Sequence, residues 1–121
     1  DRMKRTYITS LNLDEQLAKK AKKELTLGYL NLEDGMFEQA KLNFELALEF
    51  DKTCADAFWG LMLVKFQLKD EDELYANPIK YKSAIYLPEC QKALDYAQEN
   101  QRKVFANILD RIFKINEGDN Y

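Results

Sequence analysis

The feature that most constrains this chain is an internal repeat with an offset of 34 residues. A shift by 34 superposes four pairs of apolar residues: Ala21 and Ala55, Leu25 and Trp59, Leu27 and Leu61, and Leu32 and Phe66. Self-similarity at such a period indicates an array of like supersecondary units. The chain has only 4 Gly and 2 Pro in 121 residues, which disfavours a turn-rich β fold. The units are therefore expected to be helical.

Apolar residues spaced three and four apart predict the individual helices. They are expected over 14–34, 37–50, 54–69, 88 to 96 or 98, and 100–116. Residues 1–12 show no strong period and are expected to be a poorly ordered or extended lead-in. Asn12 and Glu15 form a plausible capping box for the first helix, and Asp34-Gly35 should end it. Asp70 is expected to cap a short acidic turn, whereas residues 75–87 show no clean period.

The first repeat has a specific set of small residues, aromatic residues and leucines. They are Leu27-Gly28, Gly35, Phe37, Ala40, Phe44 and Ala47-Leu48. Gly28, Ala40 and Ala47 are small where two paired helices would approach, and the two phenylalanines would fill the gaps between them. This set resembles the tetratricopeptide-repeat family, most closely bacterial members without an assigned activity. The resemblance implies an all-α fold, an α-α superhelix of paired helices.

The second repeat begins like the first and then departs from the pattern. Ala93-Leu94 echoes Ala47-Leu48 at an offset of 46 rather than 34, which predicts a 12-residue insertion within about 70–87. Met62 stands where a small residue is expected. We expect one domain over 1–121: repeat one at 21–54, repeat two at 55–100, and a C-terminal capping helix at 100–116. The fold would be a solenoid fragment of two helix pairs.

Composition limits the setting in which the chain works. Hydrophobic residues make up 46% and charged residues 32%, so the chain is expected to be globular and not inserted in a membrane. It has no secretory pattern at its start, which favours a cytoplasmic location. A start without methionine is compatible with a piece of a longer protein. The net charge is +4 over 1–23, −8 over 24–77 and +1 over 78–121. The acidic centre argues against nucleic-acid binding.

Catalytic and metal chemistry find little support in the residue types. The absence of His excludes nucleophile–His catalysis within this chain, and the two cysteines cannot complete a zinc site without it. Cys54 and Cys90 are expected to be reduced, semi-buried thiols, although the sequence also allows a disulfide bond between them. The acidic run 70–73 and the lysines around Ala21 are expected to be solvated helix faces. We therefore expect no enzyme, no cofactor and no metal.

A protein-binding groove is the functional site that the resemblance implies. In the family the first helix of each repeat lines the concave surface, here Leu25, Tyr29, Leu32, Trp59, Leu63 and Phe66. Tyr29 and Leu63 stand where a carboxylate clamp would need Asn. If exposed, these six residues would form a large apolar patch. The expected function is binding a peptide or helix of another protein. The alternatives are homodimerisation through the same surface, or coverage of the groove by the final helix or by residues 1–12.

Overall fold

A computed structural model describes the backbone of residues 2–118 and the side chains of residues 13–114. The described chain is all-helical and contains no strand. Its elements are α1 (Arg2–Glu33), α2 (Phe37–Phe50), α3 (Ala55–Lys65), α4 (Asp72–Ala76), the 3-10 helix η1 (Lys82–Tyr86), α5 (Pro88–Tyr96) and α6 (Glu99–Gly118). The predicted all-α class is confirmed.

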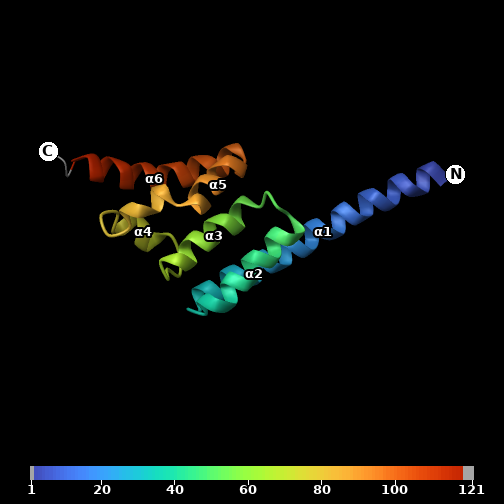
Figure 1. Cartoon of the computed structure of the whole chain (residues 1–121), viewed down its shortest axis with the longest axis horizontal. Helices are drawn as coiled ribbons and strands as arrows, with labels where there is room; N and C mark the ends of the chain where they lie inside the picture. The colour runs from blue at the N-terminus through green and yellow to red at the C-terminus, as the bar shows by residue number, and fades with distance from the viewer. Residues whose placement is uncertain (1, 119–121) are drawn as a thin grey trace.

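The first two helices form an antiparallel hairpin (Figure 1). α1 ends at Glu33, where Gly35 adopts a left-handed φ of 76°. The amide of Met36 donates to the carbonyl of Asn31 (2.8 Å), and that of Gly35 donates to Leu32 (3.0 Å). These two bonds satisfy carbonyls that the helix end leaves free. The predicted end at Asp34-Gly35 is therefore confirmed.

The start of α1 differs from the expectation. The helix begins at Arg2 and runs through Asn12, so the predicted lead-in and the capping box at Asn12 are both wrong. The chain has neither Gly nor Pro before Gly28, and without these breakers a helix that has formed extends readily. α1 has 32 residues and α2 has 14. At 1.5 Å per residue α1 is ~27 Å longer, and Figure 1 shows its N-terminal part projecting beyond the other helices.

α3 lies at the centre of the molecule. It packs against α1, α2 and α5, and its Trp59 also stacks on Phe105 of α6. The helix ends at Lys65, four residues earlier than predicted. Gln67 takes the left-handed position there (φ 56°), and the amide of Leu68 donates to the carbonyl of Leu63 (2.9 Å). The sequence does not reveal this end, because a non-glycine residue occupies the place where glycine is usual.

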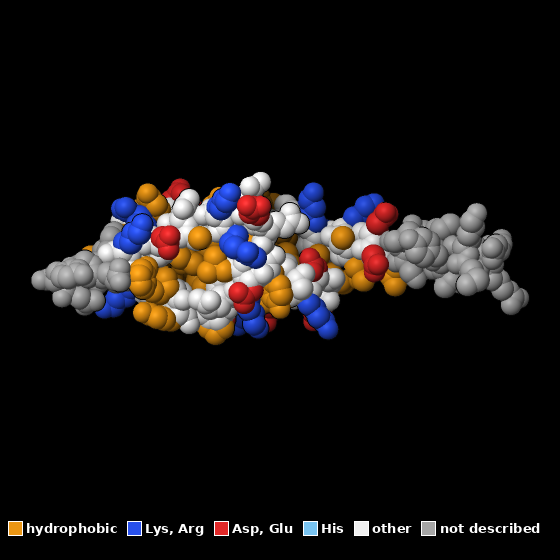
Figure 2. Space-filling model, turned by 90° about the horizontal axis from the view of Figure 1, so that it is seen from above, with side chains coloured by type: hydrophobic (Ala, Val, Ile, Leu, Met, Phe, Trp, Pro, Cys, Tyr) orange, Lys and Arg blue, Asp and Glu red, His pale blue; other side chains and the backbone are white. Residues whose placement is uncertain are grey.

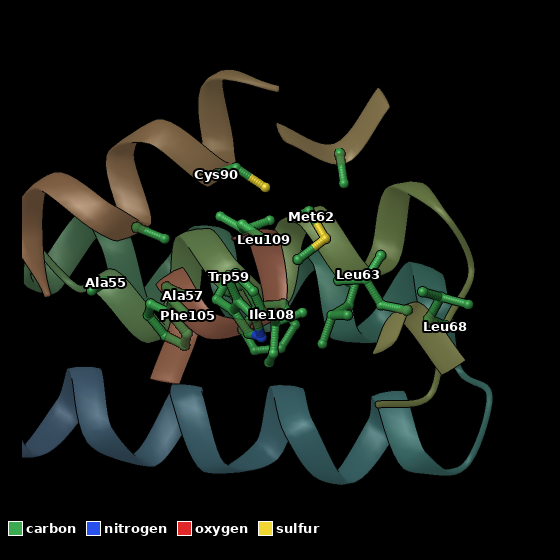
Figure 3. Close-up of a cluster of buried hydrophobic side chains, with 14 of the residues drawn as sticks. Ala55, Ala57, Trp59, Met62, Leu63, Leu68, Cys90, Phe105, Ile108 and Leu109 are labelled. Atoms are coloured by element: carbon green, nitrogen blue, oxygen red, sulfur yellow. The ribbon is translucent and has the colours of Figure 1, made fainter. Parts of the chain in front are cut away.

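The predicted insertion contains two short helices. α4 begins at Asp72, and its N-cap residue is Glu71 rather than the predicted Asp70. The Asp70 carboxylate still accepts a hydrogen bond from the Asp72 amide (2.9 Å). η1 then leads into α5, which opens with Pro88 as predicted. α6 packs against α4, η1 and α5. Buried side chains from α1 to α6 form one cluster (Figure 3). No helix of the described residues is long and apolar enough to cross a membrane.

Candidate functional site

The six residues of the predicted groove lie in the core cluster or pack against it. Leu32, Trp59 and Leu63 are buried, while Leu25, Tyr29 and Phe66 are half-buried and pack against that cluster. The prediction of an open apolar groove at these residues is therefore corrected. Other parts of the same chain cover this surface. The correction has a simple physical reason: covering these apolar side chains stabilises the fold, and the rest of the chain supplies the cover.

The final helix covers the centre of that surface. The rings of Trp59 and Phe105 stack with centroids 4.2 Å apart and planes inclined by 11°. Figure 3 shows Ile108 and Leu109 of the same helix beside this pair. Only 2% of Trp59 is exposed, and its indole N–H has no hydrogen-bond acceptor among the described residues. Of the two covers considered from the sequence, α6 covers Trp59, whereas the side chains of residues 1–12 lie outside the described part.

Two other contacts close the ends of the surface. The hydroxyl of Tyr29 donates to the backbone carbonyl of Asp56 (2.6 Å), and its ring meets Phe44 edge-on at 4.9 Å. Burial, with Asp56 next in importance, raises the pKa of Tyr29 well above its ordinary value. Phe66 meets Tyr81 edge-on at 5.4 Å. These contacts leave only part of the Tyr29 and Phe66 side chains accessible.

A hollow lies where α3 and α6 begin. It measures about 590 Å³ and is lined by Asp51, Thr53, Cys54, Ala55, Asp56, Tyr96, Gln98, Glu99, Asn100 and Gln101. Asp56 accepts a hydrogen bond from Gln101, and burial raises the pKa of that carboxyl. Asp51 accepts from the amide and hydroxyl of Thr53. Asp51 thus closes the turn between α2 and α3, and Asp56 links α3 to α6, so both carboxylates have hydrogen-bond partners within the chain.

The cysteines and acidic residues do not assemble into a metal site. Within the described residues, no group of three or more Cys, Asp or Glu side chains could hold a metal ion. Cys54 is half-buried and Cys90 is buried, and both are free thiols, as the sequence analysis favoured. Burial raises the pKa of both, that of Cys90 to about 12. The thiols are therefore kept protonated, which is the unreactive form.

The outer side of the α1–α2 hairpin carries apolar residues that the chain leaves uncovered. Leu27 (39% exposed) and Leu30 (52%) come from α1, and Leu42 (56%) and Leu46 (38%) come from α2. We call these four residues the leucine face. A chain of hydrogen bonds joins the helices beside them: Asn31 donates to Asn43 (2.8 Å), and Asn43 donates to Glu24 (2.9 Å). These two hydrogen bonds fix how the two helices are aligned.

The leucine face was missed from the sequence, although a pattern there could have revealed it. Leu42 and Leu46 are four residues apart and lie off the inward stripe of α2, which consists of Ala40, Phe44 and Ala47. α2 therefore has two apolar stripes, whereas a helix on a globular surface needs one. The other side of the molecule, along α5 and α6, mixes apolar side chains with charges of both signs (Figure 2).

Comparison of the chain with protein-family models, curated proteins and solved structures found no match.

Proposed function

We propose that this chain is a non-catalytic protein-interaction module that binds a helix of a polypeptide on its leucine face. The observation that carries the proposal is the exposure of Leu27, Leu30, Leu42 and Leu46 on one side of one hairpin. Single exposed leucines are ordinary on a protein surface, but a group on one side is typical of an interaction site. The expected partner presents an apolar helix stripe, which packs on such a surface by interdigitating side chains.

Tetratricopeptide-like architecture is part of this proposal. α1 pairs with α2 and α3 pairs with α5, with α4 and η1 between the helices of the second pair. Phe44 lies against Gly28 of its own pair and Gly60 of the next. These contacts support a superhelix of two helix pairs with α6 as its cap. In this arrangement the surface between first helices is filled, and binding moves to the outer side of the first pair.

Site-specific photocrosslinking tests the proposed function. A photoreactive phenylalanine analogue replaces Leu42 in the full chain, which is irradiated in the cells that produce it. The expected result is a covalent adduct with a polypeptide, because Leu42 is the most exposed of the four leucines (56%). The matched control carries the analogue at Tyr86, which is 78% exposed and lies on η1. A Leu42 variant that stays uncrosslinked, or that behaves like the Tyr86 control, would count against the proposal.

A further inference from the structure

Resting on the proposed function, the geometry points to a specific partner for the leucine face: the leucine face of a second copy of this chain. Each α1–α2 hairpin would pack on the other, with α1 of one copy over α2 of its partner, in a twofold-symmetric bundle of four helices. A twofold interface uses the same patch on both copies, so the patch must be complementary to itself. The leucine face and its charged margins meet that condition.

The margins of the hairpin carry opposite charge. On α1, a stripe at helical spacing reads Lys19, Lys23, Leu27 and Leu30, and both lysines are exposed. On α2, Leu42, Leu46 and Glu49 follow one another at spacings of four and three residues, and the Glu49 carboxylate is exposed. Glu38 and Glu45 are exposed too, but they line a hollow with Leu61 and Val64 of α3. The leucines thus lie next to cations on α1 and next to the carboxylate of Glu49 on α2. Crossing α1 over the partner's α2 pairs leucine with leucine and lysine with glutamate.

The alignment of the hairpin brings these charges to the same level. Asn43 bonds to both Glu24 and Asn31, so it lies opposite the middle of that stretch of α1. Glu49 follows Asn43 by six residues, or ~9 Å along the antiparallel helix. It is therefore level with the segment of α1 that carries Lys20 and Lys23. The twofold arrangement preserves this level, so Glu49 of each copy meets that basic segment of the other.

The charged residues of these margins are free to make this contact. The ion pairs within the described part of the chain are Lys65–Glu89 and Lys103–Glu99, which involve neither margin. Lys20 packs over the ring of Phe50 at 5.7 Å and helps to hold the end of α2 against α1. Lys19 and Lys23 make no such contact with the side chains of residues 13–114.

Mass and affinity measurements on the full chain give the first test. Analytical ultracentrifugation over a range of concentrations should show a monomer–dimer equilibrium. Leu42→Ser combined with Leu46→Ser should weaken the dimer at least ~100-fold, because the two substitutions in each copy remove four leucines from the symmetric interface. Tyr86→Ser is the matched control and should leave the equilibrium unchanged. A wild-type chain that stays monomeric up to its solubility limit overturns the inference, and so does a dimer that the leucine variant leaves intact.

A charge exchange tests the pairing itself. Glu49→Lys alone and Lys23→Glu alone should each weaken the dimer, because each places like charges across the interface. The double variant should recover most of the wild-type affinity, since the pair is restored with its signs exchanged. Circular dichroism checks that all three variants remain helical. A double variant no tighter than the weaker single variant refutes the pairing of α1 with the partner's α2.

The photocrosslinking adduct separates this inference from the proposed function. An adduct of twice the chain mass that contains only this chain supports both. The chain can instead be monomeric by ultracentrifugation and form an adduct with a different polypeptide. That result supports the proposed function and shows that the partner is not a second copy. The lack of any adduct at Leu42 overturns both.

Discussion

Phe44 illustrates how one side chain sets the size of its neighbours. A Cβ built on Gly28 would lie 2.5 Å from the ring of Phe44, and one built on Gly60 would lie 2.4 Å from it. The ring is therefore held between α1 and α3 at two points where only glycine fits. The repeat pattern correctly predicts a small residue at Gly28, but it predicts the next one at position 62. Gly60 takes that role, and Met62 is buried in the core.

Gly28→Ala and Gly60→Ala should each destabilise the chain by about 1–3 kcal/mol, as overpacking of a core does. This cost exceeds the gain of up to about 1 kcal/mol that alanine brings to a helix interior. Urea melts of each variant measure the effect. Phe44→Leu removes the ring and should reduce the cost of either alanine in a double-mutant cycle. Costs that simply add would show that the ring does not restrict these positions.

Trp59 tests whether the predicted groove is covered in solution. Trp59→Ala should cost about 3–5 kcal/mol, as aromatic truncations in cores do. Tyr86→Ala, at an exposed site, should cost no more than about 0.5 kcal/mol. Because Trp59 is the only tryptophan, its fluorescence should be blue-shifted and protected from quenchers. A red-shifted, quenchable Trp59 with a small cost of truncation would mean that the groove is open.

Cys90 should make the stability of the chain depend on alkaline pH. Burial raises the pKa of its thiol from 9.0 to about 12 in the folded chain. Above pH 9 the unfolded chain releases this proton while the folded chain keeps it, so the free energy of unfolding falls by about 1.4 kcal/mol per pH unit up to about pH 12. Cys90→Ala should be less stable than the wild type at pH 7, and the difference should shrink as the pH rises from 9 to 11. A constant difference would contradict the raised pKa.

Among the helices, α6 contributes an apolar stripe that closes the core. Phe105, Ile108, Leu109 and Ile112 are buried, whereas Val104 and Phe113 on its other side are about half exposed. The sequence of this helix has seven large apolar residues at helical spacing, from Val104 to Ile115, but only four of the six whose side chains are described are buried. The stripe lies against α4, η1 and α5, and Phe105 reaches α3. These contacts support the capping role expected of the last helix.

Ile112→Ala should destabilise the chain by about 2–5 kcal/mol, because Ile112 is fully buried and its truncation leaves a cavity. Val104→Ala, on the same helix and 54% exposed, should cost no more than about 0.5 kcal/mol. Truncation after Asn100 removes the entire stripe and should prevent cooperative folding. A truncated chain that melts near the wild-type temperature would refute the capping role.

For the whole molecule, the length of α1 divides the chain into a packed body and a projection. Residues 13–20 are exposed except for Leu17, which is half-buried, whereas Leu32 near the other end of the helix is fully buried. Helices without tertiary packing are marginally stable in water. One continuous helix therefore combines a segment held by the core with a segment held mainly by its own hydrogen bonds.

Hydrogen exchange should resolve this division. In dilute solution the amides of residues 13–17 should exchange much faster than those of residues 25–32, because local opening there breaks few apolar contacts. Mass spectrometry of peptides that separate the two segments measures the difference. Comparable protection of both segments in the monomer would mean that some part of the chain covers the projection.

The elements follow from the sequence because their causes are local. Apolar spacing predicted the extent of α2 without error, and Pro88 and Gly35 marked helix ends through their own backbone preferences. The small residues of the first hairpin were recognised for the same reason, since their fit depends on residues nearby in the chain. Errors began where local preference was weak, at the start of α1 and at Gln67.

What covers each apolar stripe was decided by the tertiary structure. Trp59 and Leu42 are both apolar or aromatic residues on a helix, and nothing adjacent in the sequence distinguishes them. Trp59 is buried because Phe105, 46 residues later, stacks on it, whereas Leu42 meets no such neighbour and stays exposed. Periodicity in a sequence identifies the faces of a helix, but burial depends on which distant segment reaches each face, and packing of the whole chain settles that choice.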